Sequence, residues 1–270
     1  AWHAYITRSG EAGGLLSDYL RRFPSGEKAA AAIYFQGRLA EEAGAGAEAH
    51  YRRVIERFPG SYYYQLAEER LGKPPASVAE RVNFEPGPEE RLRIRRARLL
   101  YDAGLAALGD GELRQAARGN PSAHILAMEL ARQAAQRDSP DQAVRHIKGA
   151  FPQYLSVPLE AAPPEFWRLA FPLSYRTSLQ RYSKTHGIEL NLLAGLIRQE
   201  SEFGVRAVSR AGARGLMQVL PATGRQLASR LKLKGYSAAS LFTADMNIRL
   251  GSYYLRGLLD AYGGRLEPAL

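Results

Sequence analysis

The sequence predicts an all-α protein. Residues 1–155 are rich in Ala, Leu, Glu, Arg and Gln, which favour helices, and Gly and Pro are confined to short gaps such as 43–46. Alternation of apolar and polar residues, which is typical of half-buried strands, is nearly absent. With 270 residues and 46% apolar content, the chain is long enough to bury a core in one large domain or two ordinary ones.

A weak internal repeat indicates how the N-terminal helices are arranged. The segment YLRRFP ends at Pro24 and VIERFP ends at Pro59, which lies 35 residues later. This spacing is close to the length of a helix-turn-helix repeat in tetratricopeptide-like arrays. HIKGAFP, ending at Pro152, repeats the pattern out of register. Each Phe-Pro pair is expected to stop a helix, because proline cannot continue the hydrogen-bonded ladder and restricts the residue before it.

The segment PLEAAPPEF, around Pro163, interrupts the helical pattern and precedes a change in composition and glycine content. We therefore predict two domains. Residues 1–165 are expected to form a helical solenoid of tetratricopeptide-like hairpins, which bury their apolar faces by stacking on neighbours. Residues 166–270 are expected to form a separate domain.

Charge and cysteine content restrict the possible functions. The formal net charge of +10 favours an acidic or polyanionic partner. We expect no nucleic-acid partner, because RIRRAR (93–98) is the only dense basic run and is typical of a solvated helix face, and because no zinc-finger spacing or phosphate-binding glycine loop occurs. The absence of cysteine excludes disulfides and thiol catalysis. No window of 18 apolar residues is present, and the start AWHAYITRSG lacks the features of a signal peptide.

One glutamate is placed well for acid–base chemistry. A helix starting near Asn191 would carry on one face, at spacings of 0, +3, +4 and +7, the residues Leu193, Leu196, Ile197 and Glu200. Because Glu200 extends an apolar face, desolvation should favour its neutral form and raise its pKa. A general acid for glycoside cleavage needs that property. The spacing alone also fits a structural glutamate held by backbone or arginine partners.

The residues that follow are expected to form a loop close to this glutamate. Gly204 can take the left-handed conformation that ends a helix, and residues 209–215 then run back towards a new helix. Pro221 fits the first turn of that helix, so Met217 and Gln218 lie just before it. The Gln218 amide could bind a sugar hydroxyl or acetamido group, or it could act as a cap.

Four ordered motifs in this region resemble a known family. They are IRQES-F (197–203), AVS--GA-GLMQ (207–218), P-T (221–223) and NI-LG--YL (247–255). Together they resemble the catalytic domain of soluble lytic transglycosylases, which are relatives of goose-type lysozyme, over roughly residues 171–270. The preceding helices look like the ring-forming helical domain of the larger soluble members. The resemblance implies a lysozyme-like α-helical catalytic domain over 166–270.

The same resemblance implies roles for five residues. Glu200 would be the only acid/base, and Ser201 follows it in the family's Glu-Ser pair. Ser209 would contact the substrate near its acetamido group, and Gln218 would line the glycan groove. We count Ser201 and Met217 among the substrate-binding residues as well, although support of the helix end by Ser201 and packing beneath the groove by Met217 are open alternatives.

Two further residues, Asn247 and Tyr254, are expected to brace the catalytic helix. The family mechanism cleaves the bond between N-acetylmuramic acid and N-acetylglucosamine in peptidoglycan. Glu200 would protonate the leaving oxygen while the substrate's acetamido group supports C1, and would then deprotonate the C6 hydroxyl that attacks C1. The product is a 1,6-anhydromuramoyl end, and no metal or cofactor is expected. No second carboxylate accompanies Glu200 at a suitable spacing, which disfavours the two-carboxylate schemes of ordinary glycosidases.

Family members usually continue into an Ala-Tyr-Asn-Ala-Gly segment whose tyrosine closes the active site. This sequence ends at Leu270, so we expect a catalytic domain truncated at its C-terminus. The expected partners are peptidoglycan glycan strands, with cell-wall enzymes or wall-associated proteins as further candidates, and the sequence does not indicate an oligomeric state. Because peptidoglycan lies outside the cytoplasm, the resemblance implies an exported protein of the periplasm or cell envelope. The alternatives are a noncatalytic peptidoglycan-binding scaffold and a hydrolytic muramidase.

Overall fold

The fold is built from helices. The computed structural model describes residues 1–26, 28–58, 61–72, 82–152, 154 and 159–269, so that Pro59 and Leu270 lie outside the described residues. Within these ranges every regular element is a helix, and β structure is limited to isolated bridges that join Arg214 to Val208 and to Val219. The all-α prediction is therefore confirmed. No helix in the described part of the chain is long and apolar enough to span a bilayer.

The chain divides into two compact units. The first comprises Ala1–Asn83 with Gln153–Ala162, and the second comprises Phe84–Pro152 with Pro163–Leu270. The division between residues 165 and 166 rests on composition and motif content, and it remains a prediction about domains.

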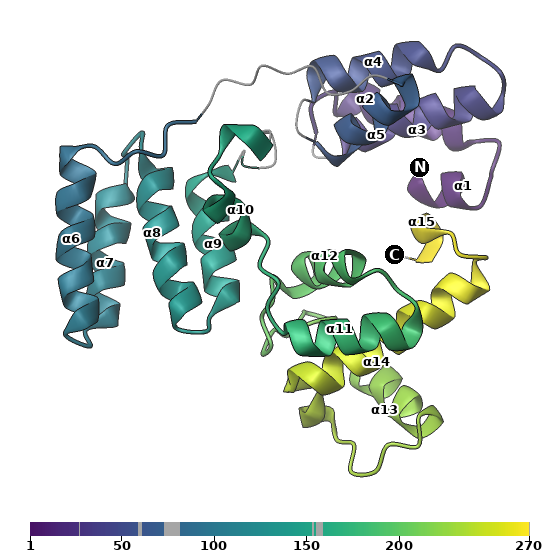
Figure 1. Ribbon diagram of the computed structural model, residues 1–270. Helices are drawn as coiled ribbons and strands as arrows, with labels where there is room; N and C mark the ends of the chain where they lie inside the picture. The colour runs from purple at the N-terminus through teal and green to yellow at the C-terminus, as the bar shows by residue number, and fades with distance from the viewer. Residues whose placement is uncertain (27, 59–60, 73–81, 153, 155–158, 270) are drawn as a thin grey trace. The chain divides into compact units, whose positions relative to one another are not determined.

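The first unit is a series of helices that pack in chain order. It contains α1 (Trp2–Ile6), α2 (Ala12–Arg22), α3 (Ala29–Glu42), α4 (Glu48–Arg57), α5 (Tyr62–Leu71) and the short 3-10 helix η2 (Leu159–Ala161) (Figure 1). Each of the helices α2 to α5 packs against the next. Their shared core includes Ile33, Tyr34 and Phe35 of α3 and Tyr51 and Val54 of α4. Burial against sequence neighbours is the packing that helical hairpin arrays require.

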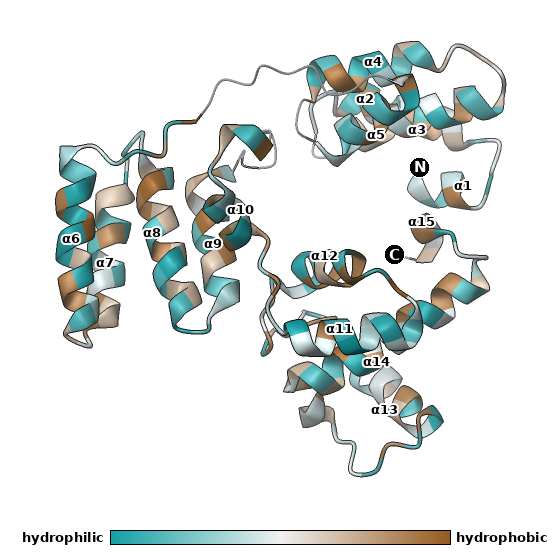
Figure 2. Cartoon of the chain, in the orientation of Figure 1, coloured by the Kyte–Doolittle hydropathy of each residue, from teal (hydrophilic) through white to brown (hydrophobic). Residues whose placement is uncertain are grey.

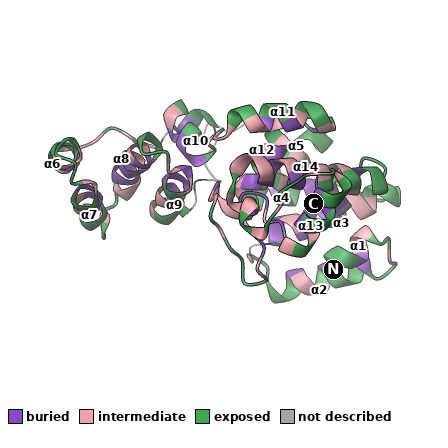
Figure 3. Ribbon diagram, turned by 90° about the horizontal axis from the view of Figure 1, so that it is seen from below, coloured by how far each residue is buried: buried purple, intermediate pink, exposed green. Residues whose placement is uncertain are grey.

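Five helices form the first part of the second unit. They are α6 (Pro88–Asp102), α7 (Ala106–Ala117), α8 (Ala123–Gln136), α9 (Pro140–Ala150) and α10 (Pro164–Ala170). The helices α6 to α9 lie side by side in chain order (Figure 1). Each carries hydrophobic and hydrophilic residues (Figure 2), and buried residues are prominent on α7, α8 and α9 (Figure 3). Hairpin packing therefore continues in this unit.

Phe-Pro pairs stop helices as predicted. The residues that follow α2, α4 and α9 and cap their C-terminal ends are Phe23, Phe58 and Phe151, each with φ between −138° and −133° and ψ between 52° and 68°. Phe171 caps α10 in nearly the same conformation, with φ −130° and ψ 69°. These extended φ values are those that a following proline imposes by steric contact. A local rule of sequence therefore sets four helix ends.

The last part of the second unit contains α11 (Arg176–His186), α12 (Leu190–Ser201), α13 (Pro221–Arg230), η3 (Ala238–Phe242), α14 (Ala244–Ala261) and α15 (Leu266–Ala269). These elements share one hydrophobic core, in which Leu193 and Ile197 of α12 are fully buried, and α14 packs against α11, α13, η3 and α15. Pro221 occupies the first turn of α13, as predicted.

The ends of α12 differ slightly from the prediction. The helix begins at Leu190, one residue before Asn191. At the other end, the left-handed residues are Glu202, with φ 52°, and Phe203, with φ 65°. The expectation that Gly204 takes this conformation was wrong. Burial of the Phe203 ring, which is 1% exposed, accounts for the difference, because tertiary packing offsets the steric cost of a left-handed side-chain residue.

Candidate active site

Glu200 lies in the last turn of α12. It continues the face that buries Leu193 and Ile197, but the residue itself is exposed. Desolvation by the protein packed around the carboxyl nevertheless raises the pKa of Glu200 above its ordinary value. None of the described residues forms a hydrogen bond or ion pair with this carboxyl group. The structure thus places at the surface a carboxyl group whose pKa is shifted in the direction that acid catalysis requires.

The neighbouring charged residues of α12 are engaged elsewhere. Arg198 Nε donates to Ala170 O at 2.8 Å, and Glu202 is paired with Lys148 of α9. Both residues therefore contact helices that precede this part of the chain.

The loop between α12 and α13 folds back on itself through backbone hydrogen bonds. Ser209 N donates to Ala213 O at 3.0 Å, and Arg214 exchanges bonds of 3.0 and 3.1 Å with Val219. Gly215 N donates to Ala207 O at 2.9 Å. These bonds give residues 207–219 a defined conformation, which a binding loop needs in order to position side chains.

Ser201 ties the end of α12 to this loop. Its Oγ donates to Leu216 O at 2.7 Å and lies 3.2 Å from Ile197 O. Because the hydroxyl group has a single hydrogen, the shorter contact with Leu216 is the stronger bond. The position of Glu200 therefore depends directly on the position of residue 216.

Asn247 holds the same loop from α14. This fully buried side chain donates from Nδ2 to Arg214 O and to Leu241 O, each at 2.8 Å, and its Oδ1 accepts from Met217 N at 2.7 Å. Asn247 therefore braces the loop and reaches α12 through it. All the hydrogen-bonding groups of this buried amide except one lone pair are satisfied within the protein.

Glycines allow the loop to approach α14 and η3 closely. Gly215 has φ +73°, and a Cβ at this position would collide with Leu241 O and Asn247 Nδ2. Gly251 of α14 leaves room for Met217, since a Cβ there would lie 2.7 Å from Met217 Cβ. The buried Met217 side chain consequently packs between the loop and α14.

Ser209 and Gln218 differ in their exposure and in their hydrogen bonds. Ser209 is exposed, and its Oγ accepts from Ala213 N at 3.1 Å. Gln218, which is half-buried with φ 46°, donates from Nε2 to Gly215 O at 2.8 Å. Its side-chain oxygen accepts from no described residue. Each side chain retains hydrogen-bonding capacity for a ligand.

Tyr254 does not show the arrangement that we expected for a brace. It is 48% exposed on α14, and no hydrogen bond or ring contact joins it to another described residue. Within the described residues, no three or more His, Asp or Glu side chains gather in a group that could hold a metal ion.

Comparisons with known proteins find a family match in this part of the chain. The family described as "Transglycosylase SLT domain" matches residues 177–270. Residues 177–270 are thus similar to a transglycosylase SLT domain, and this matched region is the SLT domain of the chain. The soluble lytic murein transglycosylase of Escherichia coli K12 is 32% identical over 94 residues, which are 34% of this chain and 15% of that protein. The membrane-bound lytic murein transglycosylase C of Actinobacillus pleuropneumoniae is 40% identical over 90 residues, covering 33% of this chain and 25% of the relative.

Structural similarity extends beyond the SLT domain. The lytic transglycosylase Slt of Pseudomonas aeruginosa has a TM-score of 0.65 and 25% sequence identity, covering 96% of this chain and 40% of the other. The 70 kDa soluble lytic transglycosylase of Escherichia coli has a TM-score of 0.62 and 23% identity, covering 94% of this chain and 40% of the other. The predicted fold, helical hairpins followed by a lysozyme-like helical domain, is confirmed. The chain spans well under half the length of these proteins.

The sequence analysis did not predict two features near the site residues, a cavity and a pair of exposed apolar side chains. A cavity of about 380 Å³ borders the end of α12 and is lined by Asp138, Ser139, Pro140, Asp141, Arg145, Tyr175, Ser201 and residues 203–207. The side chains of Val208 and Leu220, which flank the predicted site residues, are 60% and 43% exposed. A search for apolar residues within the glycine-rich loop would have found these two, whereas the cavity depends on contacts between distant segments.

Removing the Ser201 hydroxyl is expected to weaken the SLT domain. We expect Ser201→Ala to lower the free energy of unfolding by about 1 kcal/mol, because Leu216 O loses its donor. Urea unfolding measures this change, and the exposed Ser229→Ala of α13 serves as the matched control, with an expected change below about 0.5 kcal/mol. A Ser201→Ala variant of unchanged stability with a raised KM for glycan would contradict the structural tie and support the substrate contact instead.

Proposed function

We propose that this chain is a lytic transglycosylase that cleaves the glycan strands of bacterial peptidoglycan, with Glu200 as its acid and then its base. The observation that carries the proposal is the raised pKa of Glu200, which no described residue neutralises, within an SLT domain. Related proteins support it, since the Pseudomonas aeruginosa enzyme was solved as an inactive glutamate-to-glutamine mutant. A 70 kDa soluble lytic transglycosylase was solved in complex with bulgecin A.

In the proposed mechanism, the neutral Glu200 carboxyl protonates the glycosidic oxygen between N-acetylmuramic acid and N-acetylglucosamine. As the C1–O bond breaks, the substrate's own acetamido oxygen supports the positive charge that develops at C1. The Glu200 carboxylate then takes the proton of the C6 hydroxyl, whose oxygen bonds to C1. The carboxyl returns to its starting state, and the product carries a 1,6-anhydro ring.

The loop over residues 207–219 would bind the sugar next to this carboxyl. Ser209, exposed on the loop, is proposed to contact the acetamido region. The Gln218 side-chain oxygen is proposed to accept from a sugar hydroxyl, because its Nε2 already bonds Gly215 O. The roles that we propose for Met217 and Asn247 are indirect, since both are buried and hold the loop in place. Asn247 acts on the catalytic helix through Leu216 and Ser201.

The pH dependence of glycan cleavage follows from Glu200. Its raised pKa keeps the carboxyl protonated at pH values where a glutamate with the ordinary value of 4.5 is ionised. We therefore expect kcat/KM to fall on the alkaline side with a midpoint above 4.5, because deprotonation removes the general acid. Initial rates on purified peptidoglycan between about pH 4 and pH 9 measure the midpoint. A decline centred at or below the ordinary glutamate value would contradict the assignment.

Analysis of the reaction products tests the proposed function itself. Peptidoglycan sacculi are digested with the protein and, in parallel, with Glu200→Gln, and the soluble fragments are identified by mass spectrometry. Anhydromuropeptides that are absent from the variant digest are expected. Reducing-end fragments would identify a hydrolytic muramidase instead. If neither protein releases fragments while both sediment with sacculi, the chain is a peptidoglycan-binding scaffold.

The proposed function also implies a cellular location for the protein. Peptidoglycan lies outside the cytoplasm, so we propose that the protein works in the periplasm or cell envelope, where other wall enzymes or wall-associated proteins are candidate partners. The net charge of +10 suits a substrate whose lactyl and peptide carboxylates are negative.

A further inference from the structure

A second candidate binding site lies between α6 and α8. A cavity of about 440 Å³ there adjoins another of about 290 Å³, and both are lined by Arg98, Asp102, Glu129 and Arg132. None of the lining residues belongs to the SLT domain. The larger cavity also has an aliphatic lining of Ile94, Leu99, Ile125 and Met128. It therefore combines cationic groups with an apolar surface.

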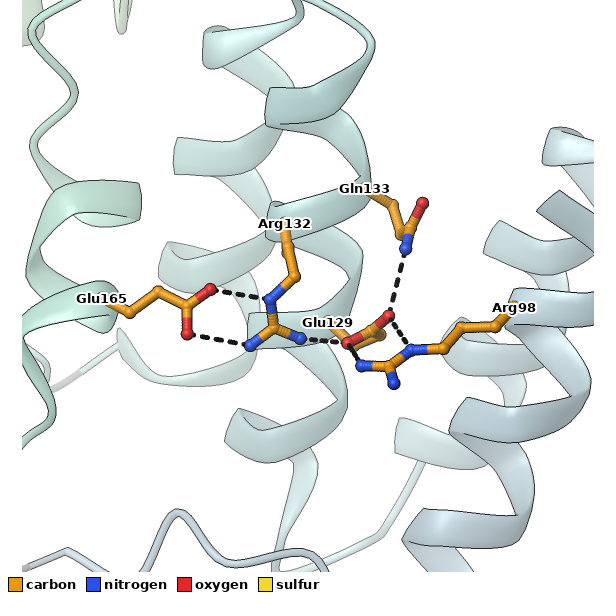
Figure 4. A network of polar contacts seen from close by, with 5 residues as sticks. All are labelled: Arg98, Glu129, Arg132, Gln133 and Glu165. Carbon is orange, nitrogen blue, oxygen red and sulfur yellow. Dashed lines mark hydrogen bonds and ion pairs between the residues drawn. The ribbon is translucent and has the colours of Figure 1, made fainter. Parts of the chain in front are cut away.

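An ion-pair network connects three residues that line this cleft, Arg98, Glu129 and Arg132 (Figure 4). Glu129, only 1% exposed, accepts from Arg98 Nε and Nη2 at 2.9 and 2.8 Å and from Gln133 Nε2 at 3.1 Å. Arg132 also binds Glu129, and it forms two bonds of 2.7 and 2.9 Å with Glu165 of α10. The network fixes both guanidinium groups and ties α6, α8 and α10 together.

The network neutralises the charge of Glu129, whereas the other lining carboxylate, Asp102, is exposed and has no ion-pair partner among the described residues. Burial alone would raise the pKa of Glu129, but hydrogen bonds from Arg98 and Gln133 and the charge of Arg132 hold it below its ordinary value. Both Glu129 and Glu165 are therefore ionised and are matched by the two arginines. One guanidinium nitrogen of Arg98, Nη1, donates to no described residue.

Additional cations lie along α6. Arg93 and Arg96 approach Glu112 of α7, at 3.0 and 4.0 Å. Arg95, by contrast, is exposed, lines the cleft and contacts no carboxylate among the described residues. We interpreted the run RIRRAR as a solvated helix face. In the structure two of its arginines, Arg93 and Arg96, lie beside Glu112 of α7, whereas Arg95 and Arg98 line the cleft.

Leu99 supplies an apolar neighbour for these cations. It is 65% exposed although it lines the cleft. Next to it, Met128 is half-buried and Ile125 is buried. A ligand that has a carboxylate beside an aliphatic group could satisfy the arginines and cover Leu99 together. Sugars usually stack on aromatic rings, and the only aromatic side chain in the larger cavity, Phe84, already packs against His124 and Phe166.

We propose that this cleft binds the short acidic peptide that peptidoglycan carries, with a peptide carboxylate on Arg95 and Arg98 and an aliphatic part on Leu99. The inference rests on the proposed function, because it takes the peptide from the same substrate. The cleft would hold a strand through its peptide while the SLT domain acts on its sugars. A bidentate contact from Arg95 and a single contact from Arg98 Nη1 would supply the specificity.

Binding of a free peptide tests this site without any cleavage step. The probe is the tetrapeptide of Escherichia coli peptidoglycan, released by an amidase and labelled with a fluorophore at its free α-amino group. Fluorescence anisotropy with the whole chain measures Kd. Arg95→Ala is expected to raise Kd about tenfold through loss of a charged hydrogen bond. The matched control, Arg96→Ala on the same helix, removes the same charge beside Glu112 and is expected to change Kd less than about twofold.

Three results would overturn the proposal. The first is the absence of saturable binding, and the second is an equal increase in Kd for Arg95→Ala and Arg96→Ala. The third is equal affinity for a labelled all-L tetraglutamate peptide, which would mean that the cleft recognises negative charge alone. Amidation of the probe's carboxylates is expected to abolish binding.

The peptide-binding assay and the glycan-cleavage assay test the two proposals separately. Glu200→Gln, which lies outside the cleft, is expected to bind the peptide with unchanged Kd. Peptide binding without glycan cleavage would overturn only the catalytic proposal, and cleavage without peptide binding would overturn only this one.

Discussion

Glu200→Gln is expected to lower kcat on peptidoglycan by at least about 10³-fold, because the variant keeps the shape of the side chain but can neither donate nor accept the proton. We expect a large effect because the Glu200 carboxyl, in the last turn of α12, has a raised pKa and forms no hydrogen bond or ion pair with the described residues. Release of soluble muropeptides, measured over time at equal protein concentration, gives the rate.

Stability measurements separate this loss from unfolding. A carboxyl group whose pKa is raised in the folded state does not change the stability of the fold at pH values below its unfolded pKa. Above that value the group destabilises the fold increasingly, and the full effect is reached above the folded pKa. Glu200→Gln is therefore expected to be at least as stable as the parent protein at pH 7. The matched control is Glu189→Gln at the other end of α12, which should retain full activity. Activity of Glu200→Gln within tenfold of the parent would exclude Glu200 as the acid.

Gly215→Ala is expected to lower the free energy of unfolding by roughly 3 kcal/mol or more, since two costs combine. The position has φ +73°, which disfavours any side chain, and the new Cβ would displace Leu241 O and Asn247 Nδ2. Displacement of Asn247 also breaks its bonds to Arg214 and Met217. Urea or thermal unfolding of the purified protein measures the loss.

A second glycine of the same loop separates the two costs. Gly212 also has a left-handed backbone, with φ +80°, but a Cβ there would meet nothing within 4 Å. Gly212→Ala is expected to cost about 1–2 kcal/mol from backbone strain alone. Equal losses in the two variants would show that close packing of the loop against Asn247 contributes nothing. Glycan cleavage should fall more in Gly215→Ala, because the shift of residue 216 reaches Glu200 through Ser201.

The sequence alone was sufficient wherever structure depends on near neighbours. Helical periodicity placed Glu200 on the same face as the buried Leu193 and Ile197, and desolvation raised its pKa in the predicted direction. Phe-Pro pairs ended helices, and Pro221 began α13, because proline restricts its own backbone and that of the preceding residue.

Tertiary contacts decided how these parts form a site. The bonds from Asn247 to the loop span 30 residues or more, and the Lys148–Glu202 pair spans 54, so no local pattern could predict them. Burial of Phe203 moved the left-handed turn away from Gly204. The sequence alone thus determined the helix and the helix face on which Glu200 lies and the direction of its pKa shift. The surroundings of Glu200 were set by the tertiary structure, because hydrogen bonds and close packing form only between segments that folding has brought together.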